Sequence, residues 1–124
     1  MKMVFTSFLI INFLIEALAA SSLIGTPEQV GVANAGPGNM WAMHYGFAVL
    51  GFASAVIWLW PYRDHHAAVT AVLGMLMTFH CAVLTSLLLE GVQQAGMIIH
   101  SVLALSAIVL FALRSRWCNA PAAL

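Results

Sequence analysis

The sequence predicts an all-α integral membrane protein, a single domain over residues 1–124 that forms a bundle of four membrane-spanning helices. Of its 124 residues, 63% are hydrophobic and only 6% are charged, whereas a soluble domain carries about 25% charged residues. The mean hydropathy is +0.99. One span needs roughly 20 mainly apolar residues, so four spans use most of the chain and leave no room for a second domain.

The first span is predicted over about residues 4–24. This stretch also resembles a secretory signal peptide, because Lys2 precedes an apolar core and Ala17, Leu18 and Ala19 resemble a small-residue cleavage site. Glu16 interrupts the region that should be apolar in a signal peptide. We therefore expect the segment to be retained as a span.

The other three spans follow from the same apolar pattern and from the residues that interrupt it. Residues 26–39 contain two prolines and three glycines, which favour a loop. Pro61 cannot continue a helix, and we expect Asp64 to be the N-cap of the helix that follows. The predicted spans are 40–60, 65–89 and 96–113, with a tight turn over 90–95.

The basic residues predict the orientation of these spans. All four Lys and Arg residues would lie on one side of a membrane: Lys2, Arg63, Arg114 and Arg116. Basic residues are enriched in cytoplasmic loops, so we expect both termini in the cytoplasm and a multi-pass protein of the cell inner membrane. The formal net charge is zero and the basic residues form no cluster, which argues against nucleic-acid binding.

Four titratable residues lie well inside the predicted spans: Glu16, His44, His80 and His100. A charge at the bilayer centre costs about 2.5–3.5 kcal/mol on insertion scales, so such residues normally mark functional sites. At a rise of about 1.5 Å per residue, Glu16 lies roughly 12 Å below the outer end of its span. On the same count, His44 and His100 lie roughly 6 Å deep and His80 about 14 Å. The count places all four in the outer-to-middle half of the bilayer and predicts one shared pocket.

Helical spacing places three of these residues on faces that also carry small side chains, which let membrane helices approach closely. These faces are Asn12, Glu16 and Ala20; His44, Ala48, Gly51 and Ala55; and Gly96, His100, Ala104 and Ala107. The pattern predicts that the polar residues face the interior of the helix bundle rather than lipid. In the third span, His80 shares a face with Met77 and Leu84.

The first functional interpretation is binding of a small lipophilic molecule, with acid–base chemistry of the kind that isomerises a double bond. A carboxyl and an imidazole in one apolar pocket can exchange protons with such a substrate. Glu16 would be the main proton carrier, and His44 or His100 its catalytic partner.

The second interpretation is cofactor binding by His44, His80 and His100. His44 and His100 lie at similar depth on different helices, as the two axial ligands of haem b would require. Three histidines and Glu16 are also suitable ligand types for zinc or copper. However, no two of these histidines share an i, i+3 or i, i+4 spacing.

The third interpretation is a structural or assembly subunit of a larger membrane complex. Interhelical hydrogen bonds from such side chains average about 0.6 kcal/mol in one membrane protein. Asn or Gln would serve that purpose without a charge to desolvate. A proton-coupled transporter remains a further alternative, but four spans would form a substrate path only in a homodimer.

The layout resembles the small four-helix membrane families grouped with DoxX-like proteins. The matching features are an outer loop that begins Gly25-Thr26-Pro27-Glu28 and a second span with the aromatic–glycine run His44-Tyr45-Gly46-Phe47. The resemblance implies a four-helix membrane fold. A helical core that holds Glu and His around a lipophilic ligand is also similar in kind to the sterol-isomerase group, which has five helices and more acidic residues. Neither resemblance transfers a catalytic residue to this chain.

Overall fold

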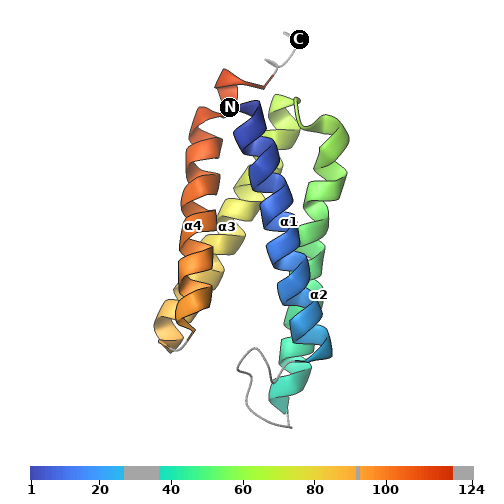
Figure 1. Cartoon of the computed structure of the whole chain (residues 1–124), viewed down its shortest axis with the longest axis vertical. Helices are drawn as coiled ribbons and strands as arrows, with labels where there is room; N and C mark the ends of the chain where they lie inside the picture. Colours follow the sequence, from blue (N-terminus) through green and yellow to red (C-terminus); the bar gives the residue numbers. More distant parts are fainter. Residues whose placement is uncertain (27–36, 92, 119–124) are drawn as a thin grey trace. The chain divides into compact units, whose positions relative to one another are not determined.

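The computed structural model of the chain describes residues 1–26, 37–91 and 93–118 (Figure 1). The described residues form four long helices, and two short 3₁₀ helices, η2 (Trp60–Tyr62) and η3 (Arg114–Arg116). The four long helices are α1 (Lys2–Gly25), α2 (Pro37–Leu59), α3 (His66–Glu90) and α4 (Gln94–Leu113). Each is long and apolar enough to cross a membrane. The all-helical class and the four candidate spans are therefore confirmed.

The observed helices extend slightly beyond the predicted spans. The helix α1 begins at Lys2, α2 at Pro37 and α4 at Gln94, each two or three residues before the predicted start. The prediction followed the apolar residues, whereas a helix can continue into the polar residues that flank them. Proline fits the first turn of α2, since an N–H there has no partner within the helix. Most of the predicted loop, residues 27–36, lies outside the described residues.

The prediction that Asp64 caps α3 is wrong. The N-cap of α3 is His65, and no side chain caps it. The Asp64 carboxylate lies instead 2.8 Å from the Nζ atom of Lys2. An ammonium group is the stronger partner for a carboxylate because both carry full charge.

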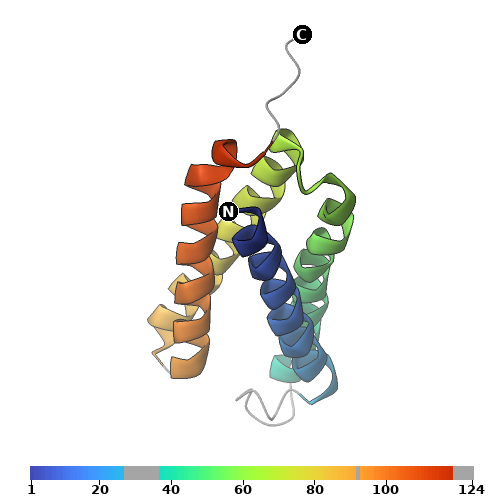
Figure 2. The ribbon, with the colours of Figure 1, turned by 45° about the horizontal axis from the view of Figure 1, so that its top comes forward.

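The chain divides into two compact units, which we call unit 1 (Met1–Phe8 and Trp58–Leu124) and unit 2 (Leu9–Ile57). In unit 2, most of α1 runs antiparallel beside α2 (Figures 1 and 2). A Cβ atom at Gly46 would lie only 2.8 Å from Cγ1 of Ile24 and 3.1 Å from the carbonyl oxygen of Ala20. Glycine at this position therefore allows the two backbones to approach closely.

In unit 1, α3 and α4 form an antiparallel hairpin (Figures 1 and 2). Gly91 ends α3 in the left-handed conformation, with a φ of 70°, and its N–H donates to the carbonyl of Leu87. Glycine adopts this cap without the steric cost of a Cβ atom. Each helix of the hairpin has a stripe of buried residues at helical spacing. These residues are Val69, Leu73, Leu76, His80 and Leu87 on α3, and Leu103, Ala104, Ala107 and Leu110 on α4.

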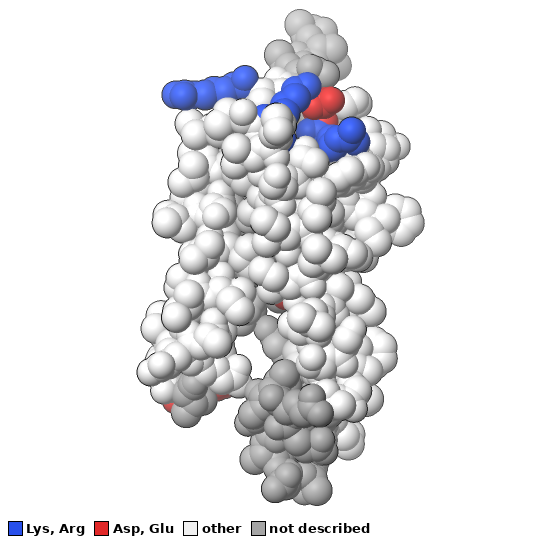
Figure 3. Space-filling view, in the orientation of Figure 1, with Lys and Arg blue, Asp and Glu red and all other residues white. Residues whose placement is uncertain are grey.

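The other end of unit 1 holds the first turns of α1 against the C-terminal part of the described chain. The rings of Phe5 and Trp117 lie 5.6 Å apart. The Nε atom of Arg114 donates to the hydroxyl oxygen of Thr70 over 2.7 Å, which joins the ends of α4 and α3. The Lys and Arg side chains gather at this end of the unit (Figure 3).

The faces predicted from small residues are partly correct. Asn12, Glu16 and Ala20 are all buried, as are Ala104 and Ala107. On α2 the prediction is wrong, because His44, Ala48 and Gly51 are exposed. The buried stripe of α2 is Ala42, Gly46, Val49, Ala53 and Val56. The helix carries two stripes of small residues, and the one that contains Gly46 packs against α1.

Candidate functional site

The candidate site is a pair of histidines that joins the two helices of the α3–α4 hairpin. The Nδ1 atom of His80 on α3 lies 3.0 Å from the Nδ1 atom of His100 on α4, which is hydrogen-bond distance. The two ring centroids are 5.3 Å apart and the rings are tilted by 41°. Both residues therefore use the same ring nitrogen for the contact between the helices.

The hairpin explains why residues twenty positions apart meet. Positions 80 and 100 are equally far from residue 90, where α3 ends. His80 follows Leu73 and Leu76 on the buried stripe of α3. His100 lies one helical turn before Leu103 and Ala104 on α4, so both rings are directed into the seam between the helices.

Aromatic packing and burial fix the pair. The ring of Phe79 lies edge-on to both imidazoles, with centroid distances of 5.2 Å to His80 and 6.2 Å to His100. His80 is fully buried, with 0% of its surface exposed. His100 is only half-buried. The pair therefore has an enclosed member on α3 and an accessible member on α4.

The contact between two Nδ1 atoms constrains the protonation of both rings. A neutral imidazole carries one proton, either on Nδ1 or on Nε2. One ring must donate from Nδ1, which leaves its Nε2 atom as an acceptor. The other ring must accept at Nδ1 and therefore carries its proton on Nε2. The neutral pair thus offers one acceptor and one donor at its two Nε2 atoms.

This arrangement can move a proton and leave both rings neutral at the end. When the acceptor Nε2 takes up a proton, the same ring passes its Nδ1 proton to the Nδ1 atom of its neighbour. The neighbour then releases its Nε2 proton, so both rings end neutral with their tautomers exchanged. Imidazole is suited to such relays because one ring nitrogen can accept while the other donates.

The other two predicted site residues belong to unit 2. Glu16 is buried on α1, with 2% of its surface exposed, and its carboxyl lies within electrostatic range of the Tyr45 hydroxyl. His44 is exposed on α2, and its ring lies edge-on to Trp41 at 5.9 Å. The participation of Glu16 and His44 in a site with His80 and His100 stays a prediction.

The direct contact between His80 and His100 was not expected from their sequence spacing or their counted depths. The count along upright helices separated them by about 8 Å. It ignored helix tilt, which averages about 20° in membranes, and the reach of two imidazole rings. The signal that predicts the contact is the turn at Gly91. It reverses the chain between two helices, so that residues equally far from the turn lie side by side.

No protein-family model, no curated protein and no solved structure matches the chain. The resemblance to DoxX-like proteins therefore stays a prediction.

Proposed function

We propose that this protein binds a small lipophilic molecule within the membrane and exchanges protons with it through His80 and His100. The observation that carries the proposal is the contact between the two Nδ1 atoms at 3.0 Å. A hydrogen bond to a polar group of the ligand would use the Nε2 atom of His100. His100 would bind the ligand, because it is the more exposed of the two rings.

A purely structural role explains the contact less well. An interhelical hydrogen bond needs only one donor and one acceptor, which Asn or Gln would supply. Two imidazoles in contact also provide two titratable nitrogens, and titratable groups inside a membrane usually mark proton pathways or ligand sites. Acid–base catalysis by a positioned group typically contributes 10²–10⁴-fold to a rate.

The test separates binding from proton transfer. The full chain is gently extracted, and native mass spectrometry measures the fraction that carries a bound small molecule. His100→Gln removes the imidazole Nε2 atom that would bond the ligand, and we expect this fraction to fall about tenfold, the equivalent of one hydrogen bond of about 1.4 kcal/mol. His66→Gln, at the start of α3, is the matched control and leaves the fraction unchanged.

Proton transfer has its own readout. The protein is incubated in D₂O, and the co-extracted molecule is analysed for deuterium at carbon. His80→Gln can still bond to His100 but cannot relay a proton, so we expect the ligand to be retained and deuterium incorporation to be lost. If wild-type protein carries no small molecule, or if both variants retain it and exchange it normally, the proposal is wrong.

A metal site is the second candidate, because the same geometry suits two ligands of one ion. With metal–nitrogen bonds of about 2.0–2.1 Å, two ligands on a tetrahedral ion lie about 3.3 Å apart. The observed 3.0 Å between the Nδ1 atoms is close to that spacing. Zinc or copper would replace the hydrogen bond between the rings, and the sequence offers Glu16 as a further ligand by type. Elemental analysis of the purified protein, with His80→Gln as control, tests this candidate.

Haem b is less compatible with the His80–His100 pair. Two axial nitrogens bind iron from opposite faces of the porphyrin, whereas these two rings contact each other directly. Haem between His44 and His100 stays a prediction. A Soret band in the purified protein would support it.

A further inference from the structure

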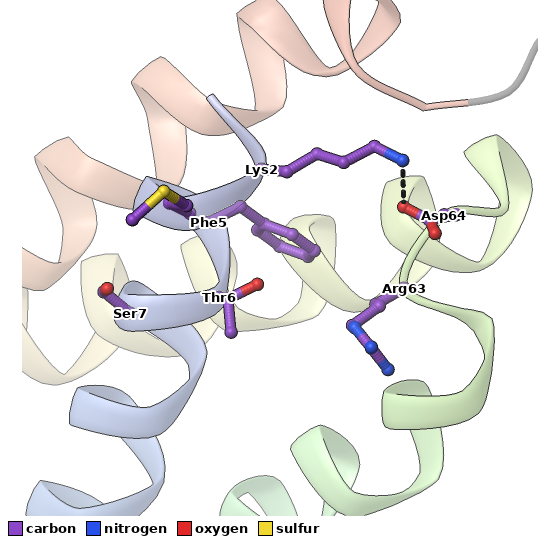
Figure 4. A pocket seen from close by; sticks show the side chains of 7 residues that line it. Lys2, Phe5, Thr6, Ser7, Arg63 and Asp64 are labelled. Atoms are coloured by element: carbon purple, nitrogen blue, oxygen red, sulfur yellow. Dashed lines mark ion pairs between the residues drawn. The ribbon is translucent and has the colours of Figure 1, made fainter.

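A second candidate site lies at the basic end of unit 1, away from the histidine pair. A pocket of about 380 Å³ opens between the first turns of α1 and the segment that joins η2 to α3 (Figure 4). Its lining includes two cations, one carboxylate, two hydroxyl groups and an aromatic ring: Lys2, Arg63, Asp64, Thr6, Ser7 and Phe5.

The charge of the pocket favours an anion. Lys2 and Arg63 each contribute one positive charge and Asp64 one negative charge, so the lining carries a net charge of +1. The chain has only four Lys and Arg residues, and two of them line this one pocket. The pocket thus holds half of the positive side chains of a protein that is otherwise almost uncharged.

The hydrogen-bonding groups of Arg63 remain largely available. Its Nη1 atom donates to the carbonyl oxygen of Trp60 over 2.7 Å, and its guanidinium lies over the Trp60 ring at 4.9 Å. A guanidinium has five N–H donors, and the described part of the structure gives Arg63 this one hydrogen bond. The Trp60 contacts hold the group in place while donors remain for a ligand.

Arg114 differs in this respect. Its Nε and Nη1 atoms donate to Thr70 and to the carbonyl of Phe111, and its guanidinium lies over the Phe111 ring. These contacts place Arg114 in the packing between α3 and α4. Arg63 is therefore the better placed of the two guanidiniums to bind a ligand.

Lys2 is bound to Asp64, but only weakly. The pair is exposed, with 58% of the Lys2 side chain and 47% of the Asp64 side chain accessible. Exposed ion pairs contribute little to stability, so Lys2 can turn from Asp64 to an anion at small cost. The Thr6 hydroxyl points toward the side of the pocket that holds Arg63 and Asp64 (Figure 4).

The surroundings indicate a lipid rather than a soluble anion. The pocket lies at the ends of helices that are long enough to cross a membrane, and Phe5 adds an apolar wall. Beside it, Trp60 and Tyr62 are exposed, with 38% and 53% of their surfaces accessible. Exposed Trp and Tyr residues mark the headgroup level of a bilayer, and basic pockets at that level bind anionic headgroups.

We propose that this pocket binds the phosphate group of an anionic phospholipid, with Arg63 and Lys2 as its cationic ligands and Thr6 as a hydrogen-bond donor. A phosphodiester presents oxygens to both cations, and arginine is well suited to bind phosphate through two parallel N–H donors. The acyl chains would leave the pocket along the apolar helix surface.

The test compares lipid retention by the detergent-purified full chain in native mass spectrometry. Phosphatidylglycerol is the anionic probe and phosphatidylcholine the zwitterionic one. We expect wild-type protein to retain phosphatidylglycerol in preference, and Arg63→Gln to lower its retention about fivefold, the effect of one basic residue near a membrane surface. Asp64→Asn should raise retention, since it releases Lys2 and removes a repulsive charge.

Arg116→Gln is the matched control, because it removes the same charge at the same end of unit 1 from a residue outside the pocket. Equal losses in Arg116→Gln and Arg63→Gln would show a general surface effect and overturn the proposal. Equal retention of phosphatidylcholine would do the same. Displacement of the lipid by millimolar inorganic phosphate would assign the pocket to free phosphate and overturn the choice of a lipid.

Discussion

A double-mutant cycle on His80 and His100 tests the candidate site most directly. Replacing His100 with leucine removes the partner at 3.0 Å and leaves the Nδ1 atom of the fully buried His80 ring without it. A buried polar atom that loses its hydrogen bond costs about 1–3 kcal/mol. We therefore expect His100→Leu to lower the free energy of unfolding by about 1–2 kcal/mol. His80→Leu should lower the free energy of unfolding by less, because the half-buried His100 ring can reach other polar partners.

The double variant His80→Leu/His100→Leu should lose less than the sum of the two single losses, because the hydrogen bond between the rings can be lost only once. Interhelical hydrogen bonds in a membrane protein have given coupling energies averaging about 0.6 kcal/mol, with a maximum of about 1.7. We expect a coupling in that range. Reversible unfolding in mixed micelles, followed by helical circular dichroism, measures all four proteins, and Ser101→Leu on the exposed face of α4 serves as control.

Simple addition of the two single losses would show that His80 and His100 do not interact. Residues that share no interaction are additive within about 0.3–0.5 kcal/mol, so a coupling below that limit would mean that the two rings do not bond in the membrane. A double variant less stable than the sum would point instead to a packing role for the imidazoles.

Three further predictions concern other parts of the molecule. Gly46→Ala should destabilise the protein by about 1–3 kcal/mol by overpacking, because the added Cβ atom would lie 3.1 Å from the Ala20 carbonyl oxygen. Gly51→Ala is the control and should not destabilise the protein, because a Cβ atom there meets open space. Thermal unfolding compares the two variants. The hydrogen bond from Lys2 lowers the pKa of Asp64 from 3.8, so the contribution of this pair to stability is complete above about pH 4 and is lost as the pH falls through the lowered value. Unfolding midpoints between pH 3 and pH 6 should therefore converge for wild type and Asp64→Asn at the acid end. Thr70→Val should cost about 1.5–3 kcal/mol in the same unfolding assay, because it removes the acceptor of a charged hydrogen bond from Arg114; no loss would mean that the bond does not form.

Composition predicted the helices well because a membrane imposes one dominant requirement on any segment that could cross it. Every backbone polar group in hydrocarbon must be bonded within the segment, so long apolar runs become helices whatever their detailed sequence. The helix ends depend on weaker local interactions. Asp64 illustrates this, since its preference for capping α3 competes with a direct ion pair to Lys2 that the sequence alone does not reveal.

The candidate site was harder to predict because it depends on how helices rotate about their axes. On α2, small residues form two stripes that are equally suited to close packing. The stripe of His44 is exposed, whereas the stripe of Gly46 is buried. On α4, Ala104 and Ala107 of the predicted face are buried, whereas Gly96 and His100 of that face are half-buried. Rotation is thus predictable only where the sequence offers a single face for close packing.

The two proposed sites can be tested independently because α3 separates them. His66 begins the helix beside the basic pocket, and His80 lies fourteen residues later, a distance of about 21 Å along the axis. Effects at such separation usually add. Arg63→Gln should therefore leave deuterium exchange of a bound ligand unchanged, and His80→Gln should leave phosphatidylglycerol retention unchanged. If either variant changes the other readout, a single elongated ligand spans both sites, with its phosphate at Arg63 and its reactive part at His100.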